Sequence, residues 1–187
     1  MFILVVLLLS LVVAFIRGGR LSALGNLRFH HLWIFFVPFT LQLMAFSPFA
    51  DAPAFGGSLA RTLYLVSMLV AAIALWLNRR LPGLVFIALG LSLNLLVITL
   101  NNGFMPVSMA AREFAGMPTI SGRTMNVVPM NAATVLPWLG DILPLPAWIP
   151  LANVFSIGDV LITIGGVLFI QRALAPPHSH LDSRTRS

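Results

Sequence analysis

The chain has 187 residues, of which 59% are hydrophobic and 9% charged, and its mean hydropathy is +0.98. Soluble domains carry about 25% charged residues, so this composition argues against a water-soluble domain and predicts a protein covered by lipid. The net charge of +6 comes from eleven arginines and no lysine, placed at the ends of apolar runs. That placement is typical of membrane topology rather than of nucleic-acid binding. The absence of cysteine excludes disulfides and thiolate metal sites.

Apolar runs recur along the chain. The first ends at Arg17, whereas a signal peptide carries its positive charge before the apolar core, so we expect a retained helix. The second contains Pro38, which predicts a kink. Together the runs predict an all-α integral membrane protein with about five transmembrane helices, at residues 2–16, 31–49, 59–77, 81–100 and 153–170.

The segment between the fourth and fifth runs, residues 101–152, is too apolar for an ordinary loop. Its prolines forbid a straight spanning helix, and irregular backbone at membrane depth needs a cover of protein or water. We therefore predict an outer lid folded onto the bundle, with residues 1–174 forming one domain. The polar residues 175–187 predict a disordered cytoplasmic tail.

Arginine counting predicts the orientation. Eight arginines fall in the links after the first and third runs and in the tail, whereas Arg61, Arg112 and Arg123 fall on the other side. By the positive-inside rule, the amino terminus lies outside and the carboxyl terminus lies in the cytoplasm. The predicted location is the bacterial cytoplasmic membrane.

Asp159 is the one acidic residue inside a predicted span. An intramembrane carboxylate costs about 2.5–3.5 kcal/mol on insertion scales, so it is a candidate functional group. The alternative is that it is protonated or paired and only pins the lid or a neighbouring helix. Ser156 and Thr163 share its helical face, Asn94 lies at matching depth in the fourth run, and Gln42 lies in the outer half of the second. We predict that these five residues form an intramembrane polar cluster.

Two helix faces carry small and polar residues, which indicates that the faces meet. We further predict that Asp159 is ionised, that a lid arginine, Arg112 or Arg123, pairs with it, and that Asn94 is its hydrogen-bond neighbour. The two faces are Ser156, Asp159, Thr163 and Gly166 on the fifth run, and Gly83, Gly90, Asn94 and Asn101 on the fourth.

Signals for catalysis and metal binding are weak. Gly140-Asp141 and Gly158-Asp159 could suggest an intramembrane aspartyl protease, which places two carboxyl groups about 3 Å apart. Ser156, however, stands where the Gly-x-Gly-Asp motif needs glycine. The histidine pairs at 30–31 and 178–180 lack the further ligands that a metal site needs, and no nucleotide-binding or hydrolase motif occurs. We predict no catalytic, metal or cofactor site.

Three motifs carry a resemblance: NGFMPVS at 102–108, LGDILPLP at 139–146 and FSIGDVL at 155–161. Together they resemble a bacterial family of small multi-pass membrane proteins catalogued only as a domain of unknown function. The resemblance implies that the lid and the fifth span are family features, and it implies no activity. The lid residues singled out are Asn102, Gly103, Pro106, Gly140 and Asp141, with Gly103 and Pro106 expected to form a turn.

The sequence therefore predicts a non-catalytic membrane protein, an accessory or scaffolding subunit of a larger complex. Its expected partners are the lipid bilayer and other membrane subunits, with no nucleic acid. One alternative is a small transporter or lipid-handling protein that uses the polar cluster around Asp159. An intramembrane aspartyl hydrolase is the least favoured alternative.

Overall fold

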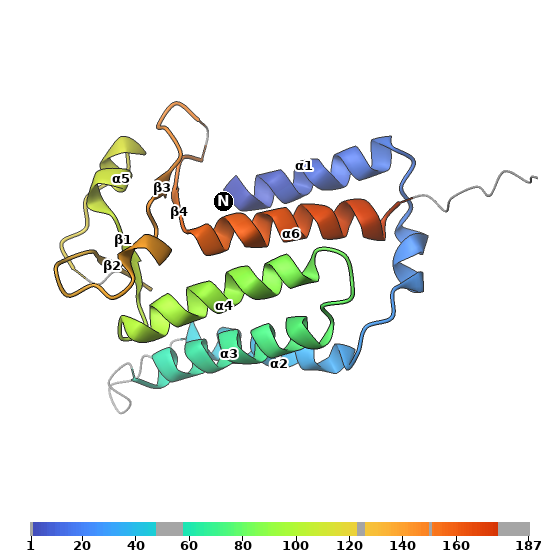
Figure 1. Ribbon diagram of the computed structural model, residues 1–187, viewed down its shortest axis with the longest axis horizontal. Helices are drawn as coiled ribbons and strands as arrows, with labels where there is room; N and C mark the ends of the chain where they lie inside the picture. The colour runs from blue at the N-terminus through green and yellow to red at the C-terminus, as the bar shows by residue number, and fades with distance from the viewer. Residues whose placement is uncertain (1, 48–57, 123–125, 150, 176–187) are drawn as a thin grey trace, which may run out of the picture.

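The structure is a computed structural model that describes residues 2–47, 58–122, 126–149 and 151–175. Two 3-10 helices, η1 (Leu21–Asn26) and η2 (Leu32–Phe35), connect the first two α-helices. The longer helices are α1 (Phe2–Ile16), α2 (Phe36–Ala45), α3 (Ser58–Leu77), α4 (Leu84–Leu100) and α6 (Ile157–Ala173) (Figure 1).

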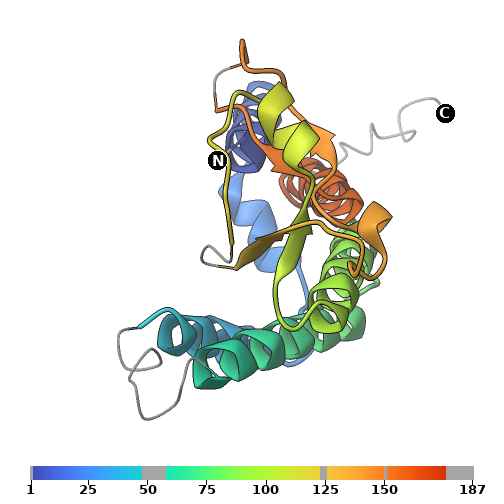
Figure 2. The same cartoon turned by 90° about the vertical axis from the view of Figure 1, so that its left-hand side faces the viewer.

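The longer helices lie side by side in one curved row. Their order across the row is α1, α6, α4, α3, α2, and each helix packs on the next. Figure 2 views the bundle nearly along the helix axes, and the row appears as an arc. The helices α1 and α2 are consecutive in the chain yet lie at opposite ends of the arc. The segment that contains η1 and η2 therefore runs along one end of the row.

Glycines set the spacing between α4 and α6. A Cβ on Gly158 would collide with the backbone carbonyl of Gly90, and a Cβ on Gly165 would collide with that of Gly83. Because the two pairs lie seven residues apart on antiparallel helices, the backbones approach along two helical turns, as small residues permit in membrane helix pairs. The predicted contact between the two faces is confirmed, although Gly166 instead faces Leu7 of α1.

The segment between α4 and α6 lies at the end of the bundle where α4 ends and α6 begins, and we call it the lid (Figure 1). Strand β1 pairs in parallel with β2, and β3 pairs antiparallel with β4. Val107 of β1 and Asp141, which lies just before β3, form an isolated bridge that connects the two small sheets. The lid contains β1 (Met105–Val107), α5 (Met109–Phe114), β2 (Val127–Pro129), η4 (Pro137–Leu139), β3 (Leu143–Pro144) and β4 (Val154–Phe155).

The predicted all-α protein with five transmembrane helices is wrong. The lid contains short strands, and within the described ranges α3 is the one helix long and apolar enough to cross a membrane. Helix α3 has 20 residues, whereas α1 has 15 and α4 and α6 have 17 each. At about 1.5 Å per residue the shorter helices fall below the roughly 30 Å of a hydrocarbon core.

Local turns and caps explain why the predicted spans are too long. The span predicted at 31–49 is divided between η2 and α2, and its end lies outside the described residues. The span predicted at 81–100 begins at Leu84, because Pro82 and Gly83 form a turn in which Gly83 has φ of 81°. The span predicted at 153–170 begins at Ile157, because the preceding residues pair with β3.

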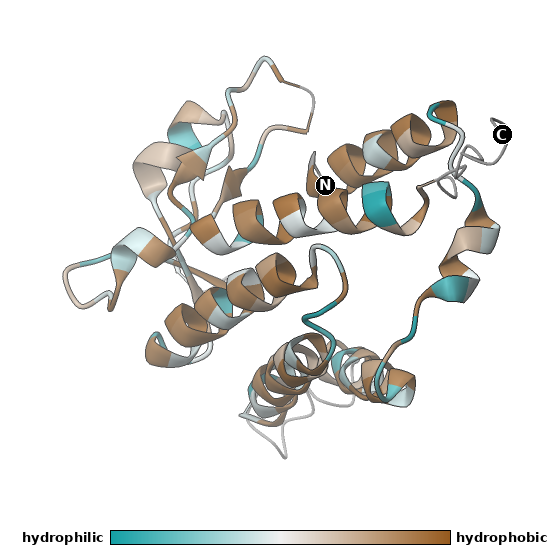
Figure 3. Cartoon of the chain, turned by 45° about the vertical axis from the view of Figure 1, so that its right-hand side comes forward, coloured by the Kyte–Doolittle hydropathy of each residue, from teal (hydrophilic) through white to brown (hydrophobic). Residues whose placement is uncertain are grey.

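Large apolar side chains lie exposed along the longer helices, and Figure 3 shows apolar residues over most of their length. Repeats of three or four residues place these side chains on one stripe of each helix. Monomeric soluble proteins rarely expose contiguous apolar patches larger than a few hundred Å². The stripes include Phe36, Phe39, Leu43 and Phe46 of α2, Val66, Leu69, Ile73 and Trp76 of α3, and Ile157, Val160, Ile164 and Leu168 of α6.

Candidate functional site

Helix α6 begins with a capping box. The Ser156 hydroxyl accepts a hydrogen bond from the Asp159 N–H at 2.9 Å, and the Asp159 carboxylate accepts one from the Ser156 N–H at 3.1 Å. These bonds satisfy donors that a helix start leaves free, and the carboxylate lies at the positive end of the helix dipole. Asp159 was predicted to lie inside a span, and it lies in the first turn of α6. The Ser-x-x-Asp spacing before an apolar run is the sequence signal for this box.

Asn94 of α4 extends the capping box into a network between two helices. Its Nδ2 donates to Asp159 Oδ1 at 3.0 Å, and its Oδ1 accepts from the Ser156 hydroxyl at 2.9 Å. Ser156 is 0% exposed and Asn94 8%. One turn further along, the Thr163 hydroxyl donates to the Asp159 carbonyl oxygen at 2.7 Å. The structure thus brings together four of the five residues of the predicted polar cluster.

Two other predicted neighbours of Asp159, Gln42 and Arg112, lie elsewhere. Gln42 belongs to α2, which packs on α3 at the far end of the row. The Arg112 guanidinium donates to the Pro118 carbonyl oxygen at 2.6 and 3.2 Å, so Arg112 does not form the predicted ion pair. Arg123 lies outside the described residues, and its pairing stays a prediction.

The lid residues divide into two groups. Asn102 and Gly103 have φ of 60° and 83° and turn the chain at the end of α4, where the Gly103 N–H donates to the Ile98 carbonyl at 2.8 Å. Pro106 lies in β1 and does not belong to that turn as predicted. Gly140 packs against the Pro106 carbonyl, which also accepts a hydrogen bond from the Asp141 N–H at 2.8 Å.

Asp141 is the second acidic group near the start of α6. Burial raises the pKa of its carboxyl to about 7, the Asp159 carboxylate adds to the rise, and the Arg112 guanidinium opposes it. The Asp159 carboxylate therefore acts on the Asp141 carboxyl through space. Each Asp159 carboxylate oxygen already accepts a hydrogen bond, Oδ1 from Asn94 and Oδ2 from the Ser156 N–H. In an aspartyl protease the two carboxyl groups instead share one proton between them. The arrangement favours a structural role for Asp159 and leaves Asp141 able to change charge near neutral pH.

Two further asparagines fasten distant segments, and sequence analysis missed this role. The Asn78 side chain accepts from the His30 N–H at 2.7 Å and donates to the His30 carbonyl at 3.0 Å. The Asn101 side chain bonds the Val135 N–H and carbonyl in the same way, at 3.0 and 2.8 Å. Each asparagine directly follows a helix, a position that commonly holds residues that end helices. That position is the sequence feature that could have indicated their role.

Charge is separated along the direction of the helix axes. At one end of the bundle, which we call the cationic end, α1 and α6 finish and α3 turns into α4. There the Arg20 N–H donates to the Leu174 carbonyl at 3.1 Å. The acidic residues that the structure describes, Glu113, Asp141 and Asp159, belong to the lid or to the first turn of α6 at the opposite end. The arginines of the cationic end are Arg17, Arg20, Arg28, Arg79, Arg80 and Arg172.

Comparison with known proteins gives a family but no function. No curated protein and no solved structure matches the chain. One family model, described as a family of unknown function (DUF5317), matches residues 26–171, which run from the last residue of η1 to two residues before the end of α6 and include the lid. That description names neither an activity nor a membrane. The predicted resemblance to a family of unknown function is confirmed, whereas the membrane character expected of that family stays a prediction; the chain belongs to the DUF5317 family of unknown function.

Proposed function

We propose that the protein is a non-catalytic component of the bacterial cytoplasmic membrane and an accessory or scaffolding subunit of a larger membrane complex. The observation that carries the proposal is the set of exposed apolar stripes on the longer helices. A single row gives each helix at most two main neighbours, so part of every helix surface has no cover from the chain itself. Apolar surface gains about 25 cal/mol per Å² when it leaves water, which favours a cover of lipid or protein.

The charge separation supports residence in a membrane. The cationic end carries six arginines and no acidic residue among the described parts of the chain. Positive charge collects on the cytoplasmic side of membrane proteins, so this end faces the cytoplasm and the lid faces outward. Helix α3 is the candidate span, and the stripes of the shorter helices beside it lie in the same apolar surroundings.

The arrangement of the row supports an accessory role. Helices α1 and α2 close the arc on either side, and each packs on one neighbour among the longer helices. On α2, the exposed stripe of Phe36, Phe39, Leu43 and Phe46 is rich in aromatic side chains, which are enriched where proteins meet. Meanwhile the polar network at Asn94, Ser156 and Asp159 is satisfied within the chain, as expected for a framework.

One observation favours the alternative, a small transporter or lipid-handling protein. A hollow of about 150 Å³ opens beside Asp159, and its walls are mainly apolar. A carboxyl group next to an apolar hollow suits a ligand with a polar head and an apolar body. The hollow is lined by Ile3, Phe155, Asp159, Val160, Thr163 and Ile164.

Two measurements test the proposal. Alkaline carbonate extraction of cells should leave the protein in the membrane pellet, and its release into solution would refute membrane residence. Native mass spectrometry after gentle solubilisation should then show a stoichiometric protein partner. A lone monomer carrying lipid or solute would contradict the accessory role and favour the alternative. Replacing Phe39 with Ser should release the partner, whereas replacing Trp148, an exposed lid residue, with Ser should not.

A further inference from the structure

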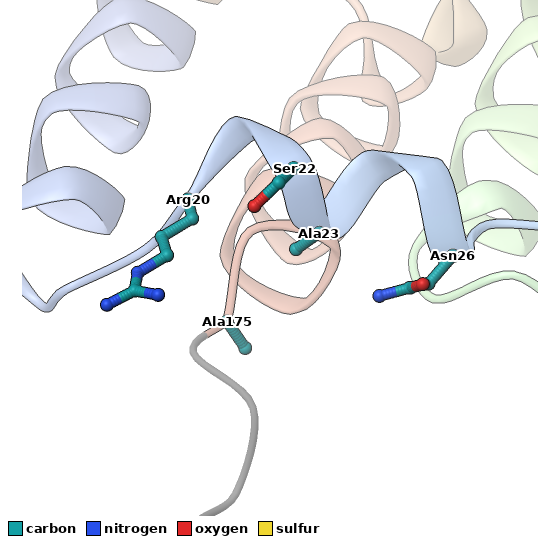
Figure 4. Close-up of a pocket in the computed structure, with 5 residues that line it drawn as sticks. All are labelled: Arg20, Ser22, Ala23, Asn26 and Ala175. Carbon is teal, nitrogen blue, oxygen red and sulfur yellow. The ribbon is translucent and has the colours of Figure 1, made fainter.

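A hollow of about 150 Å³ lies at the cationic end, between η1 and the residues that follow α6. Figure 4 shows Arg20 and Asn26 on opposite sides of the hollow, with Ser22 between them and Ala175 below. Backbone hydrogen bonds fix these walls, because the Arg20 N–H donates to the Leu174 carbonyl at 3.1 Å and the Ala23 N–H donates to the Arg20 carbonyl at 3.0 Å. The hollow is therefore held open by the fold.

The polar side chains around the hollow are available to a ligand. Within the described chain, no hydrogen-bond or ion-pair partner occupies the Arg20 guanidinium, the Ser22 hydroxyl or the Asn26 amide. Two other arginines of the same end are engaged: Arg17 donates to Gln171 Oε1 at 3.3 Å, and Arg79 donates to the Trp76 carbonyl at 3.0 Å. The guanidinium offers a planar fork of donors that matches phosphate oxygens, and the hydroxyl and amide supply further donors.

We infer that this hollow, the η1 hollow, binds the phosphate group of an anionic phospholipid. Its volume of about 150 Å³ suits one phosphate group, and the rest of the ligand extends out of its open side. The surrounding arginines, with no described acidic residue at this end, attract an anion to it.

The shape of η1 points to a lipid as the source of the phosphate. In a 3-10 helix, residues three apart lie on the same side, so Arg20, Ala23 and Asn26 face the hollow together. Leu21 and Leu24 form a separate side and are 62% and 40% exposed. A short helix with one polar and one apolar side fits the boundary between headgroups and acyl chains. The lipid source rests on the membrane residence proposed above, whereas the phosphate chemistry does not.

The test uses the purified full chain in neutral detergent micelles, so that it does not depend on where the protein resides in cells. Native mass spectrometry measures binding of dihexanoyl phosphatidylglycerol, with dihexanoyl phosphatidylcholine as the zwitterionic comparison. We expect the anionic lipid to bind at least about fivefold more tightly, and Arg20→Gln to weaken its binding about five- to tenfold. Asn26→Ala should weaken it about fivefold through loss of one neutral hydrogen bond.

The matched control is Arg80→Gln, which removes the same charge from an exposed arginine of the same end that does not line the hollow. Binding to this variant should stay within about twofold of the wild type. Equal losses in Arg20→Gln and Arg80→Gln would show attraction by diffuse charge only and overturn the site. Equal binding of both lipids would overturn the anionic ligand. If inorganic phosphate binds more tightly than the anionic lipid, phosphate binding stands, but the lipid assignment is overturned. Release of the protein by carbonate would refute membrane residence without changing the micelle result.

Discussion

Replacing Gly158 with Ala should separate the two central helices. The added Cβ would collide with the Asn94 side chain and would lie 2.6 Å from the Gly90 carbonyl oxygen, which is fixed backbone. Overpacking of this kind costs about 1–3 kcal/mol, and displacing Asn94 loses hydrogen bonds worth about 1 kcal/mol each. We therefore expect the free energy of unfolding to fall by about 3 kcal/mol, roughly a hundredfold in the unfolding constant.

The assay is unfolding in mixed detergent micelles, followed by circular dichroism as the fraction of denaturing detergent rises. Gly25→Ala is the matched control, because a Cβ at Gly25 would meet no atom within 4 Å. The control should change the free energy of unfolding by less than about 0.5 kcal/mol. If Gly158→Ala unfolds at the same detergent fraction as Gly25→Ala, the close contact of α4 and α6 does not stabilise the fold and the reasoning fails.

Three other changes have defined outcomes. Because burial raises the folded-state pKa of Asp141 to about 7 from 3.8, the folded chain binds the proton more tightly, and stability should fall between about pH 4 and pH 7. Asp141→Asn should remove this fall and be about 4 kcal/mol more stable than the wild type at about pH 8; equal pH profiles would contradict it. Asn78→Ala leaves the His30 backbone without its partner and should destabilise the chain by about 2–3 kcal/mol in the same micelle assay. Asn101→Ala, at a more exposed bond pair, should speed deuterium exchange of the Val135 N–H about tenfold while leaving exchange in β1 unchanged; unchanged exchange at Val135 would show that Asn101 does not hold the lid.

Sequence patterns that depend on local composition predicted the structure well. The apolar run at 2–16 forms a helix over the same residues, α1, although α1 is too short for the predicted span, and the run at 59–77 is α3 with one residue added. The faces of α4 and α6 could be paired, because their small residues repeat with helical spacing and leave few other ways to pack. The resemblance to a family of unknown function could be seen from three short motifs, at 102–108, 139–146 and 155–161, because each is local in the sequence.

Features that depend on tertiary contacts could not be predicted. Counting depth along each run placed Gln42 with Asp159, but depth does not reveal which helices are neighbours, and α2 lies at the far end of the row. The two- and three-residue strands of the lid carry no alternating pattern long enough to detect. The Ser-x-x-Asp spacing at Ser156 is a sequence signal for the start of a helix. The predicted span nevertheless began at residue 153, before this signal, because Val154 and Phe155 are as apolar as the helix that follows.

The order of the helices gives the segment 17–35 a mechanical role. It joins the two outermost helices of the arc, and two points fix it along the way, the Arg20–Leu174 bond at α6 and the Asn78–His30 pair at the end of α3. The segment therefore limits how far α1 and α2, at the two ends of the arc, can separate. The lid, in contrast, starts from α4 and ends at α6, the two helices locked by glycine contacts. The lid is therefore attached at both of its ends to the central pair, and the segment 17–35 alone joins the two ends of the arc.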